Sequence, residues 1–172
     1  RLVRAALKYV TPGNALALDD STTVAQIADI IQEVTPITVL TNGLGMINRL
    51  CTEPGVDVIS LGGKYHRGFN GFFGLQCERA TEDYIVDVSI MSTTTIQGTA
   101  LFTQEEQVVR MKRIMLKIAR KSILLVDSSK FTYSALNHAA DLVDFDHVII
   151  SSNTDPENLE SLRKAGIVFE LA

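Results

Sequence analysis

One short stretch, ALALDDSTTVAQIAD at residues 15–29, indicates how this chain folds. Residues 15–18 form a short apolar run of the kind found in a buried β-strand. Two acids and three hydroxyl side chains follow, and apolar residues then recur at the spacing of a helix. Open α/β proteins bind anions at such strand-to-helix turns, because the first N–H groups of the helix are free to donate.

The same alternation of apolar runs and helical segments continues along the chain. Further apolar runs predict strands at 37–40, 56–60, 88–91, 122–126, 147–150 and 167–170. Helical spacing predicts helices near 1–10, 23–33, 44–52, 75–84, 104–119 and 156–165. Because most of the apolar runs show little polar alternation, both faces of the sheet are expected to be covered. The sequence therefore predicts an α/β fold, with a doubly wound, mostly parallel sheet and helices on both faces.

Composition and charge exclude several classes of function. The 172 residues suit one domain, and a net charge of −4 without a charged block predicts no nucleic-acid-binding surface. Cys51 and Cys77 lie far apart, which favours a reduced, cytoplasmic setting. The three histidines are scattered, so no metal is expected, and no cofactor is predicted either. No apolar run approaches the roughly 18 residues that span a membrane, so no membrane partner is expected.

Small polar residues collect after five of the predicted strands. These segments are 19–23 (DDSTT), 41–43 (TNG), 62–64 (GGK), 92–95 (STTT) and 127–130 (DSSK). In a parallel sheet the carboxyl ends of all strands meet at one edge, and ligands bind there at the point where the strand order reverses. Amides, hydroxyls and lysine side chains suit a phosphate or a carboxylate. The pattern therefore predicts an anion-binding site at that edge.

Several of these segments also have a purely structural interpretation. Thr23 with Gln26 has the spacing of a capping box, as has Thr103 with Glu106 before the longest predicted helix. The segment 41–43, taken alone, predicts a tight turn. Both interpretations stay open for Thr23, because a capping residue can also contact a ligand.

The glycine-rich region after the third predicted strand is expected to be the loosest part of the chain. Paired glycines at 62–63 commonly mark a turn. The segment 64–74, KYHRGFNGFFG, contains three glycines and is expected to be a mobile loop over the site. Lys64 or Arg67 would then meet the anion.

Four motifs in this chain resemble the C-terminal sensor domain of DeoR-family transcriptional repressors. They are ALDDSTT (17–23), TNGLGMI (41–47), SLGGKYHRGFNGFFG (60–74) and DSSKF (127–131), in the same order and at similar spacing. The resemblance implies a ribose-5-phosphate isomerase-like, Rossmann-like fold that senses phosphorylated sugars or related metabolites. In such regulators a winged helix-turn-helix domain precedes the sensor and binds DNA. The chain is then a single effector-binding domain over 1–172, which meets DNA only through that missing N-terminal domain.

The resemblance also implies which residues bind the ligand. Those that match its motifs are Asp19, Ser21, Thr22, Thr23, Thr41, Asn42, Gly62, Gly63, Asp127, Lys130 and Phe131. Their places at predicted strand ends, or in the loose segment, add Gly43, Lys64, Arg67 and Thr93. The resemblance implies that Lys130 faces the phosphate. Asp20 and Ser21 depart from the family pattern, and a second acid there either repels the phosphate, points away from the site or contacts sugar hydroxyls.

The predicted site lacks the equipment of an isomerase. An isomerase needs a general base beside the substrate carbon, usually a carboxylate. The loop at 92–98 contains no acid, and Asp19 and Asp127 are better explained as orienting the loops around them. The sequence therefore predicts a non-enzymatic sensor of a phosphorylated sugar that associates with further copies of itself. A phosphosugar isomerase and a ligand-free dimerisation module are the alternatives.

Overall fold

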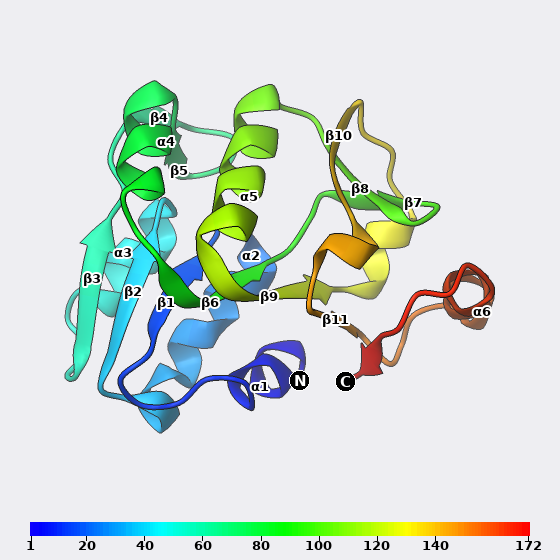
Figure 1. The fold of residues 1–172 in the computed structure, drawn as a ribbon, viewed down its shortest axis with the longest axis horizontal. Coiled ribbons are helices and arrows are strands. Elements are labelled where there is room, and N and C mark those ends of the chain that lie inside the picture. The colour runs from blue at the N-terminus through cyan, green and yellow to red at the C-terminus, as the bar shows by residue number, and fades with distance from the viewer.

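The computed structural model describes all residues, 1–172, and its core is a seven-stranded parallel sheet (Figure 1). The strands are β1 (Ala15–Leu18), β2 (Ile37–Thr41), β3 (Val56–Ser60), β6 (Val86–Met91), β9 (Ala119–Val126), β11 (His147–Ile150) and β12 (Glu170–Leu171). They lie in the order β12-β11-β9-β6-β1-β2-β3, and every adjacent pair is parallel. The chain leaves β1 toward one edge, returns to β6 and proceeds toward the other. The predicted doubly wound sheet is confirmed, and its strand order reverses between β1 and β6.

Helices cover both faces of this sheet. They are α1 (Leu2–Leu7), α2 (Thr22–Ala25), α3 (Leu44–Leu50), α4 (Leu75–Glu82), α5 (Glu106–Ile118) and α6 (Pro156–Lys164). The first three pack into one apolar cluster and the last three into another, and Figure 1 shows α5 crossing β6 and β9. Along β9, Ile123 and Leu125 belong to one cluster, whereas Leu124 and Val126 belong to the other. This two-sided burial explains why the predicted strands lack polar alternation.

Both predicted capping boxes are wrong. The helix after β1 begins one position earlier, because the Val24 N–H donates to Ser21 Oγ at 3.2 Å, so Ser21 and not Thr23 is the N-cap. After one α-helical turn the chain continues as two 3₁₀ segments, Gln26–Asp29 and Ile31–Val34, in place of one helix over 23–33. Thr103 ends a strand, and α5 starts after Glu105 without a side-chain cap.

Two small antiparallel sheets were not predicted. β4 (Lys64–His66) and β5 (Gly71–Phe73) form a hairpin in the segment expected to be a loose loop. β7 (Thr95–Gln97), β8 (Ala100–Thr103) and β10 (Asn137–Asp141) form a three-stranded sheet. These strands have only three to five residues, and β10 is separated from β8 by all of α5 and β9. Such short runs carry too little periodicity to be distinguished from loops.

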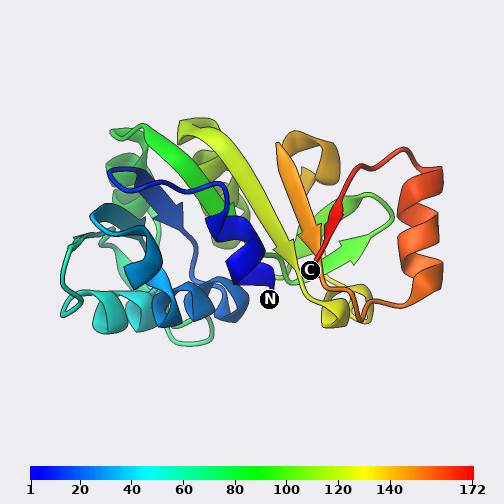
Figure 2. The ribbon, with the colours of Figure 1, turned by 90° about the horizontal axis from the view of Figure 1, so that it is seen from below.

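The two ends of the chain lie side by side at the surface (Figure 2). Lys8, just after α1, forms an ion pair with Glu170 of β12 at 3.2 Å, and the Ser152 N–H donates to the carbonyl of Ala172. No helix combines the length and the apolar character that crossing a membrane requires.

Candidate functional site

A cavity of about 370 Å³ opens where the strand order reverses, at the carboxyl ends of β1 and β6. Open parallel sheets bind ligands at this position, because the two neighbouring loops diverge there and leave a crevice. Segments that are far apart in the sequence supply its walls. The lining residues are Asp20, Ser21, Thr22, Gly68, Phe69, Thr93, Thr94, Val108, Lys112, Lys130 and Tyr133.

The floor of the crevice is a buried ion pair between Asp19 and Lys112. Lys112 Nζ donates to Asp19 Oδ2 at 2.8 Å and to the carbonyl of Ser92 at 2.6 Å. Asp19 also accepts from the N–H and hydroxyl of Ser21 and from the N–H of Ser92, so both of its oxygens are satisfied. Asp19 is therefore a structural acid that joins the loops after β1 and β6.

Lys112 was not among the predicted site residues, although the sequence contains a signal for it. It lies four residues after Val108 and three before Met115, on the apolar stripe of α5, and it is only 5% exposed. A lysine on the buried face of a helix is rare unless a carboxylate pairs with it. The interruption of that stripe therefore pointed to an acid beneath α5.

Asp20 lines the cavity beside this pair and forms no ion pair of its own. A Cβ added at Gly43 would lie 3.1 Å from the Asp20 Cα, and one added at Gly71 would lie 3.2 Å from the Asp20 Cβ. The two glycines therefore pack closely against Asp20 and confine it. Its removal from solvent raises the pKa of the Asp20 carboxyl to about 6, and the Asp19 carboxylate adds to that rise. The positive charge of Lys112 lowers the pKa of Asp20, and so does the hydrogen bond from Asn42 Nδ2 to Asp20 Oδ1 at 3.5 Å.

Four of the predicted ligand residues do line this cavity: Ser21, Thr22, Thr93 and Lys130. A second, adjacent hollow is bounded by Thr22 and Lys130 as well, and it brings in Thr23, Asp127 and Arg1. Asp127 accepts from the Ser129 N–H at 3.0 Å, which lowers the pKa of its carboxyl and shapes the turn that presents Lys130. The predicted segments 19–23, 92–95 and 127–130 thus meet at one place.

The predicted residues of the second segment are buried beneath the site instead of lining it. Thr41 Oγ1 accepts from the Gly43 N–H at 3.1 Å, as in a tight turn. Asn42 Nδ2 donates to the carbonyl of Phe72 at 3.0 Å, and the Phe72 N–H donates to the Asn42 carbonyl at 2.8 Å. Asn42 Oδ1 is buried without a partner. These contacts attach the β4–β5 hairpin to the loop after β2.

The remaining predicted residues lie outside both hollows. Lys64 and Arg67 are exposed on the hairpin, whose turn contributes Gly68 and Phe69 to the cavity instead. Phe131 packs against the apolar cluster that contains α5. Gly62 and Gly63 connect β3 to the hairpin and do not reach the ligand cavity.

The two adjacent glycines are expected to respond differently to alanine. Gly63 has a φ of +139°, and an added Cβ would lie 2.6 Å from the Phe73 carbonyl oxygen, whereas Gly62 has open space. Gly63→Ala is therefore expected to lower the free energy of unfolding by about 2 kcal/mol, and Gly62→Ala by a few tenths. Urea unfolding of the two variants measures the difference, and equal losses would contradict a steric role for Gly63.

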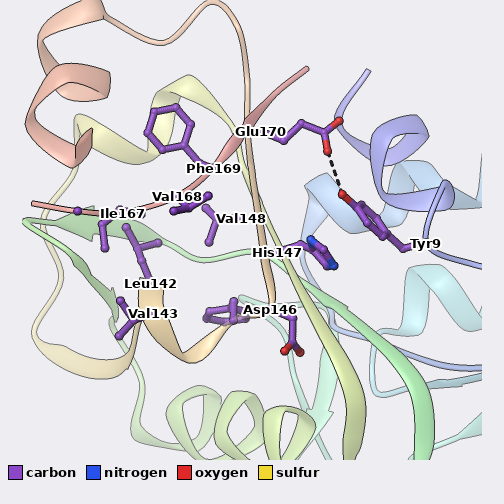
Figure 3. Close-up of a pocket in the computed structure, with 12 residues that line it drawn as sticks. Tyr9, Leu142, Val143, Asp146, His147, Val148, Ile167, Val168, Phe169 and Glu170 are labelled. Carbon is purple, nitrogen blue, oxygen red and sulfur yellow. Dashed lines mark hydrogen bonds between the residues drawn. The ribbon is translucent and has the colours of Figure 1, made fainter. Parts of the chain in front are cut away.

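A larger hollow, about 400 Å³, lies at the opposite edge of the sheet (Figure 3). It adjoins the start of β11 and is walled mainly by apolar side chains such as Leu142, Val148 and Ile167. Its two acids are already engaged: Glu170 accepts from the Tyr9 hydroxyl at 3.1 Å, and Asp146 accepts from Ser122. No lysine or arginine lines this hollow, so it is unsuited to an anion.

A parallel sheet with a cavity lined by lysine, carboxyl and hydroxyl groups at its switch point has the architecture of a small-molecule-binding α/β domain. Residues 1–152 match the family model of the DeoR C-terminal sensor domain, and the chain belongs to this family. It is 31% identical over 96% of its length to an Escherichia coli O157:H7 protein assigned as transcriptional repressor of the aga operon, covering 62% of that protein. It is 29% identical over 92% of its length to the L-fucose operon activator of Haemophilus influenzae, covering 64% of it. The chain thus spans about 60% of the length of these relatives.

Solved structures of differently named proteins share this fold. Ribose 5-phosphate isomerase A of Methanocaldococcus jannaschii aligns with 76% of this chain and 52% of its own, with a TM-score of 0.50 and 18% identity. The beta subunit of eIF2B from Chaetomium thermophilum aligns with 86% of this chain and 48% of its own, with a TM-score of 0.59 and 15% identity. At these identities the likeness concerns the fold alone.

Proposed function

We propose that this domain binds a phosphorylated sugar, or a related phosphorylated metabolite, in the cavity at the switch point and does not transform it. The observation that carries the proposal is that Lys130 and Thr22 meet around one hollow, which Ser21 and Thr93 also line. The Ser21 hydroxyl already donates to Asp19 and the Thr93 hydroxyl to backbone carbonyls, so the free donors are the Lys130 ammonium group and the Thr22 hydroxyl, which offer a charge-assisted and a neutral hydrogen bond to phosphate oxygens. The curated relatives are named as transcriptional regulators, which supports sensing as the role of that binding.

We propose that the response reaches DNA through a winged helix-turn-helix domain in the rest of the full-length protein. Arg1, at the start of α1, bounds the second hollow together with Lys130 and Thr22. A ligand that draws Lys130 toward the cavity therefore changes the surroundings of α1 directly. A coupling free energy of roughly 1 to 3 kcal/mol between ligand binding and DNA binding changes the affinity for an operator about five- to 150-fold. Self-association of the protein is part of this proposal, and analytical ultracentrifugation tests it.

Lys130→Ala is the direct test of the binding site. At ligand concentrations of about 100 times Kd, wild-type protein is expected to gain roughly 5 to 10 °C in Tm with the sugar phosphate that fits. The variant should lose that gain, because the cavity then lacks its only unpaired ammonium group. Thermal shift with pentose, hexose and amino sugar phosphates, and with the unphosphorylated sugars, measures both effects.

The matched control is Lys164→Ala, on exposed α6 away from the cavity, which should keep the full thermal shift. An undiminished shift in the Lys130 variant would place the phosphate elsewhere. No shift with any sugar phosphate would instead support a ligand-free dimerisation module.

One observation favours an isomerase as a second candidate. Asp20 presents a carboxyl with a pKa of about 6 to the cavity, which suits a general base. Turnover of ribose 5-phosphate or glucose 6-phosphate by wild-type protein, abolished in Asp20→Asn, would establish that alternative. We expect no turnover, since Lys112 is held by Asp19 and Ser92 and is not free to polarise a substrate carbonyl.

A further inference from the structure

The charges around the switch-point cavity divide into a satisfied pair and two free groups. Asp19 and Lys112 neutralise each other in the floor of the crevice. Lys130 and Asp20 remain, and neither has an ion-pair partner within 4.0 Å. The cavity therefore offers its ligand one ammonium group and one carboxylate, which is the complement of a molecule that carries both a negative and a positive group.

We propose that the ligand is a phosphorylated amino sugar, with its phosphate on Lys130 and its ammonium group on Asp20. This inference rests on the proposed function and narrows its ligand class. A dianionic phosphate ester of a neutral sugar would satisfy Lys130 but bring further negative charge beside Asp20. An ammonium group on the same ligand compensates the Asp20 carboxylate where water is scarce, so the interaction is stronger than one made in open solvent.

Asp20 is held at the cavity wall by the backbone segments packed around it. Gly43, at the start of α3, and Gly71, in β5, leave no room for a side chain against its Cα and Cβ. Three segments from β1, β2 and the hairpin thus hold the carboxyl at the cavity wall. Its one hydrogen bond within the protein, from Asn42 Nδ2, is long at 3.5 Å and leaves most of its accepting capacity for a ligand.

Neutral hydroxyls of a sugar are the competing partners for Asp20. They donate hydrogen bonds to a carboxylate but leave its charge uncompensated. The two cases differ in one measurable respect, because only an ammonium group makes the affinity depend on charge at the sugar. Matched sugars that differ at a single substituent therefore separate them.

The experiment is calorimetric titration of the purified protein at pH 7 with two matched pairs of ligands. One pair is glucosamine 6-phosphate and glucose 6-phosphate, and the other is galactosamine 6-phosphate and galactose 6-phosphate. In at least one pair the amino sugar phosphate is expected to bind about tenfold more tightly or better. N-acetylglucosamine 6-phosphate, whose amide is uncharged, should show no such advantage.

Asp20→Asn should bind both members of the preferred pair with nearly equal affinity. Asp83→Asn, an exposed acid after α4 that lines neither hollow, should keep the wild-type preference. Equal affinity within both pairs for wild-type protein, or a preference that survives in Asp20→Asn, would overturn the inference and leave the proposed function intact. The wild-type comparison decides the matter even where the variant is poorly folded. Failure of every sugar phosphate to bind would overturn the proposed function as well.

Discussion

Replacing Lys112 with methionine is expected to lower the free energy of unfolding by about 3 to 5 kcal/mol, the largest loss among the substitutions considered. Methionine fills a similar volume on the buried face of α5 but leaves the Asp19 carboxylate without its cation. Asp19 is 2% exposed, so water cannot replace the missing charge. The carbonyl of Ser92 loses its donor at the same time. Urea unfolding followed by circular dichroism measures the loss.

The double variant Asp19→Asn/Lys112→Met shows whether the loss comes from an uncompensated charge. When Asp19→Asn has removed the carboxylate, Lys112→Met should lower the free energy of unfolding by about 1 to 3 kcal/mol less than it does in wild-type protein. Lys117→Met, on the exposed side of the same helix, should change stability by less than about 0.5 kcal/mol. Additive losses in the double variant would show that Lys112 acts through packing alone.

The second large effect is a stability penalty from Asp20 that appears as the pH rises. The pKa of its carboxyl is about 6 in the folded protein and 3.8 as its ordinary value. Between these values the folded protein retains a proton that the unfolded chain has released, so the contribution of Asp20 to stability is present below about pH 4 and declines through pH 6. The decline approaches about 3 kcal/mol, from about 1.4 kcal/mol for each unit of pKa difference.

Asp20→Asn removes this titration, so the difference between variant and wild type isolates it from all other groups. The two proteins should be similar in stability near pH 3, where Asp20 is mostly protonated in both the folded and the unfolded state. At pH 8 the variant should be more stable, by up to about 3 kcal/mol. Chemical unfolding from pH 3 to pH 8 measures the difference, and a difference that does not change with pH would show that the pKa of the Asp20 carboxyl is the same in the folded and unfolded states.

Charge has opposite consequences for stability at two neighbouring acids of this crevice. Asp19 is stabilised by four donors, one of which is the Lys112 ammonium group, and it holds the loops after β1 and β6 together. Asp20, one residue further on, is held without such compensation. An acid that lowers stability in the free protein is consistent with a group whose partner arrives with the ligand.

Much of the fold was predictable because its signals are local. A buried parallel strand requires a continuous apolar run, and a covering helix requires apolar residues at helical spacing, so both appear in any short window of the sequence. The strands at 15–18, 56–60 and 147–150 have the predicted bounds. The edge of the sheet at which the polar segments meet was also predictable from the sequence, because the carboxyl ends of parallel strands all lie at one edge.

What the sequence determined by itself was the doubly wound sheet and the convergence of segments 19–23, 92–95 and 127–130 on one cavity. Only the tertiary structure decided which side chains face that cavity. It buried Asn42 beneath the site, left Lys64 and Arg67 outside it, and placed Lys112 against Asp19, 93 positions earlier in the chain. Burial and ion pairing depend on where distant segments meet in space, and the spacing of residues along one segment carries no record of that.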